Sequence, residues 1–143
     1  MRMWMVEPQY MCKDHLLGDH KEIHMLVSAV KRGISLDGYL NGNLLEIHSL
    51  RPRHDALVKE MLARGYSHYS DLPDFNVREA GVIDRDEATM ELFCRCTKCY
   101  DRYNHAPEPL LERWHAYRDS IKQLELLPDR VWNRINFRLA YGR

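Results

Sequence analysis

The sequence has few features that would divide, anchor or unfold its 143 residues. With Gly 7 and Pro 6 it is neither collagenous nor of low complexity. Uncharged stretches such as residues 23–30 are far shorter than the roughly 20 apolar residues of a membrane span. Residues 1–7 have no apolar core followed by a small-residue cleavage site, so we expect no signal peptide. There is no internal repeat or dividing linker, and residues 1–143 are predicted to form one domain.

The sequence has no excess of positive or negative charge. Lys+Arg 21 balances Asp+Glu 21, which excludes a histone-like polycation but not a local basic surface. Residues 71–91 contain seven acids and two bases, a local net charge of −5, and residues 130–143 contain four arginines and no acid, a local net charge of +4. Four cysteines without a secretory signal indicate thiols in a reducing compartment, so we expect a cytoplasmic protein.

Hydrophobic residues recur at helical spacing, and no segment shows sustained alternation with a period of two. We therefore expect a compact all-α domain of three to five helices. Asp14 and Gly33 are predicted to cap the first helix, Pro52 to lie in the first turn of a second that ends at Gly65, and Asp84 to cap a third. The segments expected to be helical are residues 14–33, 52–65, 84–103, 110–124 and 129–139.

The first helix carries an unusual set of polar residues: His15, Asp19, His20, Lys21, Glu22 and His24. Glu22 lies seven residues after His15, so the two project in nearly the same direction, two turns apart. Glu22 is expected at the boundary between core and solvent, where a carboxylate can be partly desolvated for proton transfer. A solvated helix face without chemistry is the other interpretation of this pattern.

Three segments resemble a known family. Residues 15–23 read HLLGDHKEI, residues 50–66 read LRPRHDALVKEMLARGY, and residues 71–73 read DLP. Together, in this order, they resemble the phage pyrimidine-dimer DNA glycosylases of the endonuclease V type. The resemblance covers residues 1–75, whereas residues 76–143 form a diverged helical half with a basic, aromatic tail. It implies an all-α, endonuclease V-like domain.

The resemblance also implies a mechanism that uses neither metal nor cofactor. The family's nucleophile is the N-terminal α-amine, assisted by a glutamate that falls here on Glu22. A gap-free alignment back from Glu22 places the nucleophile on Met1, which is normally retained before a residue as large as Arg2. An α-amine has a pKa of about 7.7–8.0, so a useful fraction is uncharged at neutral pH. Met1 and Glu22 are therefore the predicted catalytic residues of a DNA glycosylase with AP-lyase activity.

The expected partner is double-stranded DNA with damaged pyrimidines, bound by a monomer away from any membrane. Arg2 and Lys21 match the family's phosphate-binding arginines, and His15 matches its active-site histidine. Further candidate DNA contacts come from the basic residues of the second helix and of the tail: Arg51, Arg53, Arg130, Arg134 and Arg138. In the tail, Trp132, Phe137 and Tyr141 lie between the arginines, as in surfaces that stack on exposed bases, although a docking helix explains the same pattern.

Other interpretations remain open. Another family arginine falls on Met25, which favours a DNA-binding module that has lost catalysis and leaves the damaged base undetermined. A zinc-stabilised structural protein would use Cys94, Cys96, Cys99 and His105. Only one CxxC pair is present in that segment, so we predict partly buried thiols without metal there.

Overall fold

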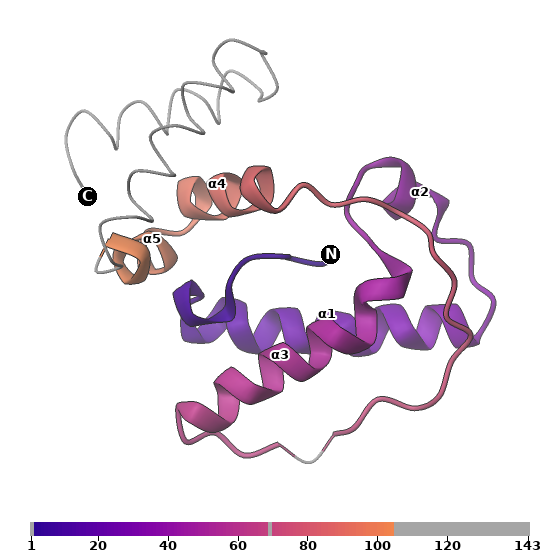
Figure 1. Cartoon of the computed structure of the whole chain (residues 1–143), viewed down its shortest axis with the longest axis horizontal. Helices are drawn as coiled ribbons and strands as arrows, with labels where there is room; N and C mark the ends of the chain where they lie inside the picture. The colour runs from indigo at the N-terminus through magenta and orange to yellow at the C-terminus, as the bar shows by residue number, and fades with distance from the viewer. Residues whose placement is uncertain (1, 69, 105–143) are drawn as a thin grey trace, which may run out of the picture.

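The computed structural model describes residues 2–68 and 70–104 (Figure 1). In these ranges the chain forms helices and loops and no strand, which confirms the expected all-α class. The helices are η1 (Pro8–Tyr10), α1 (Lys13–Lys31), α2 (Asp37–Asn41), η2 (Ile47–Ser49), α3 (Leu50–Ala63), α4 (Arg85–Arg95) and α5 (Thr97–Asn104). Of the helices described, none is long and apolar enough to cross a membrane. The helices expected within residues 110–139 lie outside the described residues.

The predicted ends of the first two long helices are confirmed. Gly33 and Gly65 adopt positive φ angles of 68° and 83° just after α1 and α3, a conformation that glycine adopts without steric cost. In each case the next N–H bonds back to the last turn, from Ile34 to Ala29 O at 3.0 Å and from Tyr66 to Met61 O at 2.9 Å. These are Schellman motifs, which stop a helix and satisfy its last carbonyls.

The start of the first helix differs from the prediction, whereas Pro52 lies in the first turn of the second helix as predicted. The N-cap of α1 is Cys12 rather than Asp14, which lies in the first turn. α3 begins at Leu50, two residues before Pro52. Proline is tolerated there because the first turn of a helix has no internal partner for its N–H groups.

The third expected helix is two helices. Its start is confirmed, since Asp84 Oδ1 accepts a hydrogen bond from the Glu87 N–H at 3.0 Å. The single helix predicted over residues 84–103 is wrong, because α4 ends at Arg95, Cys96 is extended at φ −125° and ψ 108°, and α5 begins at Thr97. No glycine or proline marks this break. It brings Cys96 and Cys99 to the start of α1, as described below.

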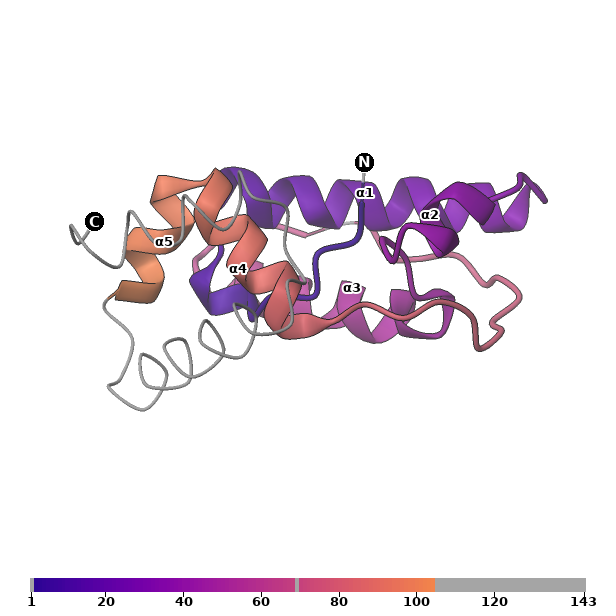
Figure 2. The same ribbon diagram turned by 90° about the horizontal axis from the view of Figure 1, so that it is seen from above.

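The N-terminal segment forms part of the core. It runs between α4 and the pair of long helices, α1 and α3, which pack against each other in two layers (Figures 1 and 2). Met3, Trp4 and Val6 are buried, and the Met3 N–H donates to Leu44 O at 2.9 Å. Backbone N–H groups of Arg2 and Trp4 also bond to Glu22 and Asp19, so this segment is fixed against the middle of α1.

Candidate active site

The start of the chain lies against Glu22. The backbone N–H of Arg2 donates to Glu22 Oε2 over 3.4 Å, and the Glu22 side chain is half-buried on α1. Met1, the predicted nucleophile, lies outside the described residues. The structure thus brings the residue bonded to Met1 to the predicted catalytic carboxylate, across 20 positions of sequence.

A buried ion pair anchors this segment. The Trp4 N–H donates to Asp19 Oδ1 at 3.0 Å, and the Arg53 guanidinium holds Asp19 Oδ2 through Nε at 3.0 Å and a second nitrogen at 2.9 Å. Arg53 also donates to Val6 O at 2.6 Å. Burial raises the pKa of Asp19 to about 6, although Arg53 and the Trp4 N–H favour its charged form. Asp19 is thus held by Arg53 and the Trp4 N–H, whereas Glu22 on the same helix contacts the Arg2 N–H.

The Arg2 side chain is held inside the protein rather than extended into solvent. Its guanidinium lies 3.9 Å from the centre of the Trp4 ring and 2.8 Å from Glu91 Oε2 on α4. The side chain is only 12% exposed. Arg2 therefore fastens the N-terminal segment to α4, and a phosphate contact would require it to leave Glu91.

The other predicted DNA contacts are divided between surface and core. Lys21 is exposed on α1. Arg51 is 42% exposed and donates to Pro73 O at 2.9 Å. Arg53, at 5% exposed, offers no surface to a phosphate, so we assign it to the core instead of the predicted basic edge. Arg130, Arg134 and Arg138 lie outside the described residues.

His15 lies among cysteines. Its Nδ1 is 3.3 Å from Cys12 Sγ and 3.6 Å from Cys99 Sγ, and its ring meets Trp4 edge-on at 6.4 Å. Cys96 joins this group, and the four potential ligand atoms all lie within 4.8 Å of one another. The zinc set considered from sequence was different: Cys94 is buried on α4 outside this group, and His105 lies outside the described residues. The matching spacings, Cys12-x-x-His15 and Cys96-x-x-Cys99, were the missed signal.

A second group of potential ligands lies between α1, α3 and the segment after α3. His20, His24, His54 and His68 each offer a ring nitrogen, and these atoms lie within 4.8 Å of one another. Burial, followed by repulsion from the neighbouring imidazoles, lowers the pKa of His20 to about 4, and similar causes lower the pKa of His24. His20 and His24 are one turn apart on α1, a signal visible in the sequence, whereas His54 and His68 are contributed by the tertiary fold.

The described residues thus form an all-α domain that holds Arg2 against a carboxylate on its first long helix. A family model described as pyrimidine dimer DNA glycosylase matches residues 1–74, slightly more than half of the chain. The chain belongs to this family, as the sequence resemblance indicated. No curated protein and no solved structure matches the chain.

Proposed function

We propose that this protein is a DNA glycosylase with AP-lyase activity that removes damaged pyrimidines from double-stranded DNA. Cyclobutane pyrimidine dimers are its proposed main substrate. Met1 supplies the nucleophilic α-amine and Glu22 assists it. We further propose that it acts as a monomer in the cytoplasm. The hydrogen bond from the Arg2 N–H to Glu22 Oε2 carries the proposal, because one peptide unit joins that nitrogen to residue 1. Family membership supports the choice of substrate.

The chemistry proceeds through an imine. The neutral α-amine attacks C1′ of the damaged nucleotide, and the glycosidic bond breaks with its electron pair leaving on the base, which takes up a proton. The nitrogen bonded to C1′ loses one proton, and its lone pair then opens the C1′–O4′ bond while O4′ takes up a proton. The product is a protonated imine between Met1 and the sugar, which keeps one N–H. Removal of a proton from C2′ then expels the 3′ phosphate by β-elimination, and water hydrolyses the imine to release the protein.

Glu22 has two proposed roles in these steps. Its negative charge stabilises the cationic sugar and the protonated imine, and its carboxylate accepts and returns protons. Its half-buried position suits both roles, because a partly desolvated charge acts more strongly on a nearby cation than a fully solvated one. Lys21, exposed beside it, is proposed to hold a phosphate as a point charge rather than as a bidentate fork.

The test compares Glu22→Gln with Glu79→Gln, an exposed glutamate in the loop before α4. Strand cleavage is measured on duplexes that carry one cyclobutane dimer or one abasic site. A positioned acid–base group typically contributes about 10²–10⁴-fold, so Glu22→Gln should lose at least about 10²-fold on both substrates. The Glu79 variant should cleave like the wild type. Equal cleavage by all three proteins would refute the mechanism.

A second variant tests the amine separately. One residue added before Met1 leaves Glu22 intact but moves the α-amine along the chain. We expect cleavage to fall while the melting temperature stays unchanged. An undiminished cleavage rate would show that another group is the nucleophile.

A non-catalytic DNA-binding module is the alternative. Met25 is 49% exposed one turn after Lys21, at the position of a further family arginine, so that phosphate contact is absent here. Binding to damaged duplex without any cleavage by the wild type would favour this alternative.

A further inference from the structure

We propose that Cys12, His15, Cys96 and Cys99 bind one Zn²⁺ as a structural site that joins the start of α1 to the junction of α4 and α5. The proposal does not depend on Glu22 or Met1. It assigns His15, which the resemblance matched to an active-site histidine, to the metal instead.

The distances fit a tetrahedral ion. Zn–S bonds of about 2.3 Å and Zn–N bonds of about 2.0–2.1 Å at tetrahedral angles place two sulfurs about 3.8 Å apart, and a sulfur and a nitrogen about 3.6 Å apart. The Cys12 and Cys96 sulfurs are 3.8 Å apart. His15 Nδ1 lies 3.3 Å and 3.6 Å from the sulfurs of Cys12 and Cys99. A ligand set of three thiolates and one imidazole with no open position is typical of structural zinc.

The backbone holds the four ligands in two short pairs. Cys12 is the N-cap of α1 and His15 lies in its first turn. Cys96 is the extended residue between α4 and α5, and Cys99 lies in the first turn of α5. The helix break at Cys96, which has no local explanation in glycine or proline, places that sulfur beside Cys12.

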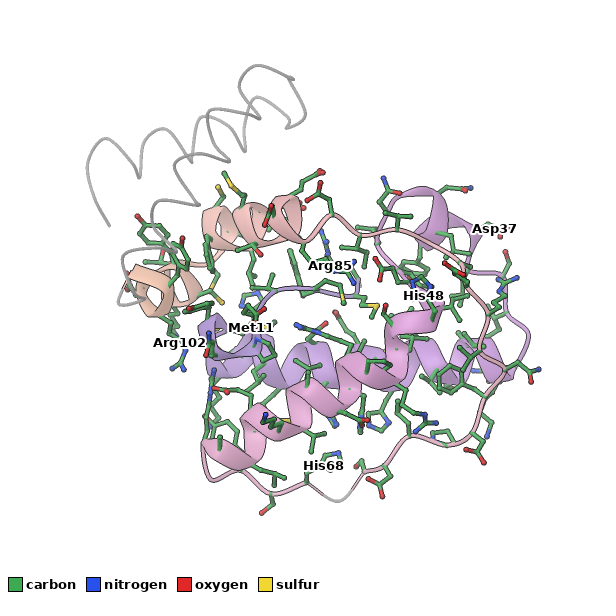
Figure 3. All side chains as sticks on the ribbon, in the orientation of Figure 1. Met11, Asp37, His48, His68, Arg85 and Arg102 are labelled. Atoms are coloured by element: carbon green, nitrogen blue, oxygen red, sulfur yellow. The ribbon has the colours of Figure 1, made fainter. Side chains whose placement is uncertain are left out.

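Backbone N–H groups point at two sulfurs of the cluster and favour their charged form. The Cys12 N–H points at Cys99 Sγ over 3.2 Å, and the Cys99 N–H points at Cys96 Sγ over 3.4 Å. Backbone donors of this kind stabilise metal-bound thiolates and fix their orientation. Cys12 and Cys99 are buried, while His15 and Cys96 are half-buried. Met11, next to Cys12, lies where η1 meets α1, close to α5 (Figure 3).

The test measures zinc in the full chain, purified under reducing conditions without a histidine tag. Cys12→Ala should lose one equivalent of zinc per chain relative to the wild type. Cys94→Ala is the matched control, because Cys94 lies two residues from Cys96 but outside the cluster, and it should keep the zinc of the wild type. Equal zinc in the wild type and the Cys12 variant, or loss of zinc from the Cys94 variant, would overturn the proposal.

A second measurement needs no variant, in case Cys12→Ala fails to fold. The wild type reconstituted with Co²⁺ should show the intense near-ultraviolet thiolate-to-cobalt charge-transfer absorption of three thiolates. Removal of the metal with a chelator should make three further thiols reactive and lower the melting temperature. A Co²⁺ protein without this absorption, or a Cys12–Cys96 disulfide in the reduced preparation, would overturn the proposal.

A separate observation supports a second site: we infer that His20, His24, His54 and His68 bind another divalent ion, Zn²⁺ or a similar ion that accepts imidazole ligands. His20 Nε2 and His68 Nε2 are 3.0 Å apart, near the roughly 3.3 Å separation of two nitrogens on tetrahedral zinc. His24 Nε2 is buried and has no hydrogen-bond partner among the described residues. His68 lies beside α3 (Figure 3), which places it near His54.

His54 has the outer contact of a metal ligand. Its Nδ1 lies 3.1 Å from Asp55 Oδ1, so Nδ1–H can donate a hydrogen bond to this carboxylate and leave Nε2 to bind a cation. Nε2 is also 3.2 Å from the Ser70 carbonyl oxygen, which it would leave on binding the ion.

The His cluster is tested with His24→Gln against His48→Gln, whose ring lies exposed outside the cluster. The His24 variant should lose one metal equivalent and keep the thiolate-to-cobalt absorption, while the His48 variant should match the wild type. Unchanged metal content in the His24 variant would overturn this second proposal and leave the cysteine site unaffected.

Discussion

Arg51 and Arg53 lie two residues apart on α3, yet the structure gives them different roles. Arg53 is 5% exposed and pairs with Asp19, which in turn accepts the Trp4 N–H of the N-terminal segment. Arg51 is 42% exposed and donates to the Pro73 carbonyl oxygen. Replacing each in turn with methionine therefore tests which arginine supports the fold and which is available to DNA.

The stability that Arg53→Met is expected to lose follows from the two buried groups that lose their hydrogen-bond partner. Asp19 becomes a buried carboxylate without its cation, and the Val6 carbonyl oxygen loses a donor at 2.6 Å. Removing one partner of a buried ion pair costs about 3–5 kcal/mol, a large part of the roughly 5–15 kcal/mol that stabilises a domain. For a chain of this size the melting temperature should fall by roughly 10–20 °C. Arg51→Met should change stability by less than about 0.5 kcal/mol.

The assay is chemical denaturation of both variants and of the double variant Asp19→Asn, Arg53→Met, with DNA affinity measured on each. The double variant should recover part of the lost stability, because no buried charge remains unpaired while the side-chain amide oxygen introduced by Asp19→Asn still accepts the Trp4 N–H. If Arg53→Met instead keeps wild-type stability and loses only salt-dependent DNA affinity, Arg53 is a DNA contact and its assignment to the core is wrong.

Three further variants follow from single contacts. Burial alone would raise the pKa of Glu46, but hydrogen bonds from Arg85, Ser49 and the Ile83 N–H outweigh it and lower the pKa to about 2. The charged form of Glu46 therefore stabilises the fold. In denaturation measured at several pH values, the difference in stability between wild type and Glu46→Gln should be complete above about pH 5 and disappear as the pH falls toward 2. A difference that does not change with pH would contradict this role of Glu46. Asp84→Ala removes the cap of α4 and should cost about 1 kcal/mol in the same experiment, whereas no loss would mean that the cap is dispensable. Lys21→Ala should lower the slope of log affinity against log salt by about 1 in a DNA titration, and an unchanged slope would remove Lys21 from the interface.

Local signals in the sequence predicted much of the fold. Gly33, Gly65 and Asp84 act through neighbours within six residues, so the helix ends and the α4 cap could be located without tertiary information. The break at Cys96 could not be located in this way. It is explained by packing against residues more than 80 positions away and not by a local turn sequence.

The sequence likewise predicted only those parts of the candidate site that depend on local signals. The position of Glu22 at the boundary between core and solvent follows from helical periodicity and family resemblance. The different roles of Arg51 and Arg53 do not follow from the sequence, because two arginines on one helix cannot be distinguished until the packing of α1 on α3 is known. The pairing of Cys12 and His15 with Cys96 and Cys99 likewise needs the folded chain, since the two matching spacings mark candidate ligand pairs but do not show that the pairs meet.

The location of a trapped covalent adduct tests the central claim most directly. The wild type is incubated with an abasic-site duplex and borohydride, which reduces an imine to a stable amine, and the digested complex is sequenced by mass spectrometry. We predict that the reduced sugar is attached to the α-amine of Met1, and that Glu22→Gln does not move the attachment point. An adduct on the ε-amine of Lys21 or another lysine, or no adduct at all, would contradict the proposed chemistry.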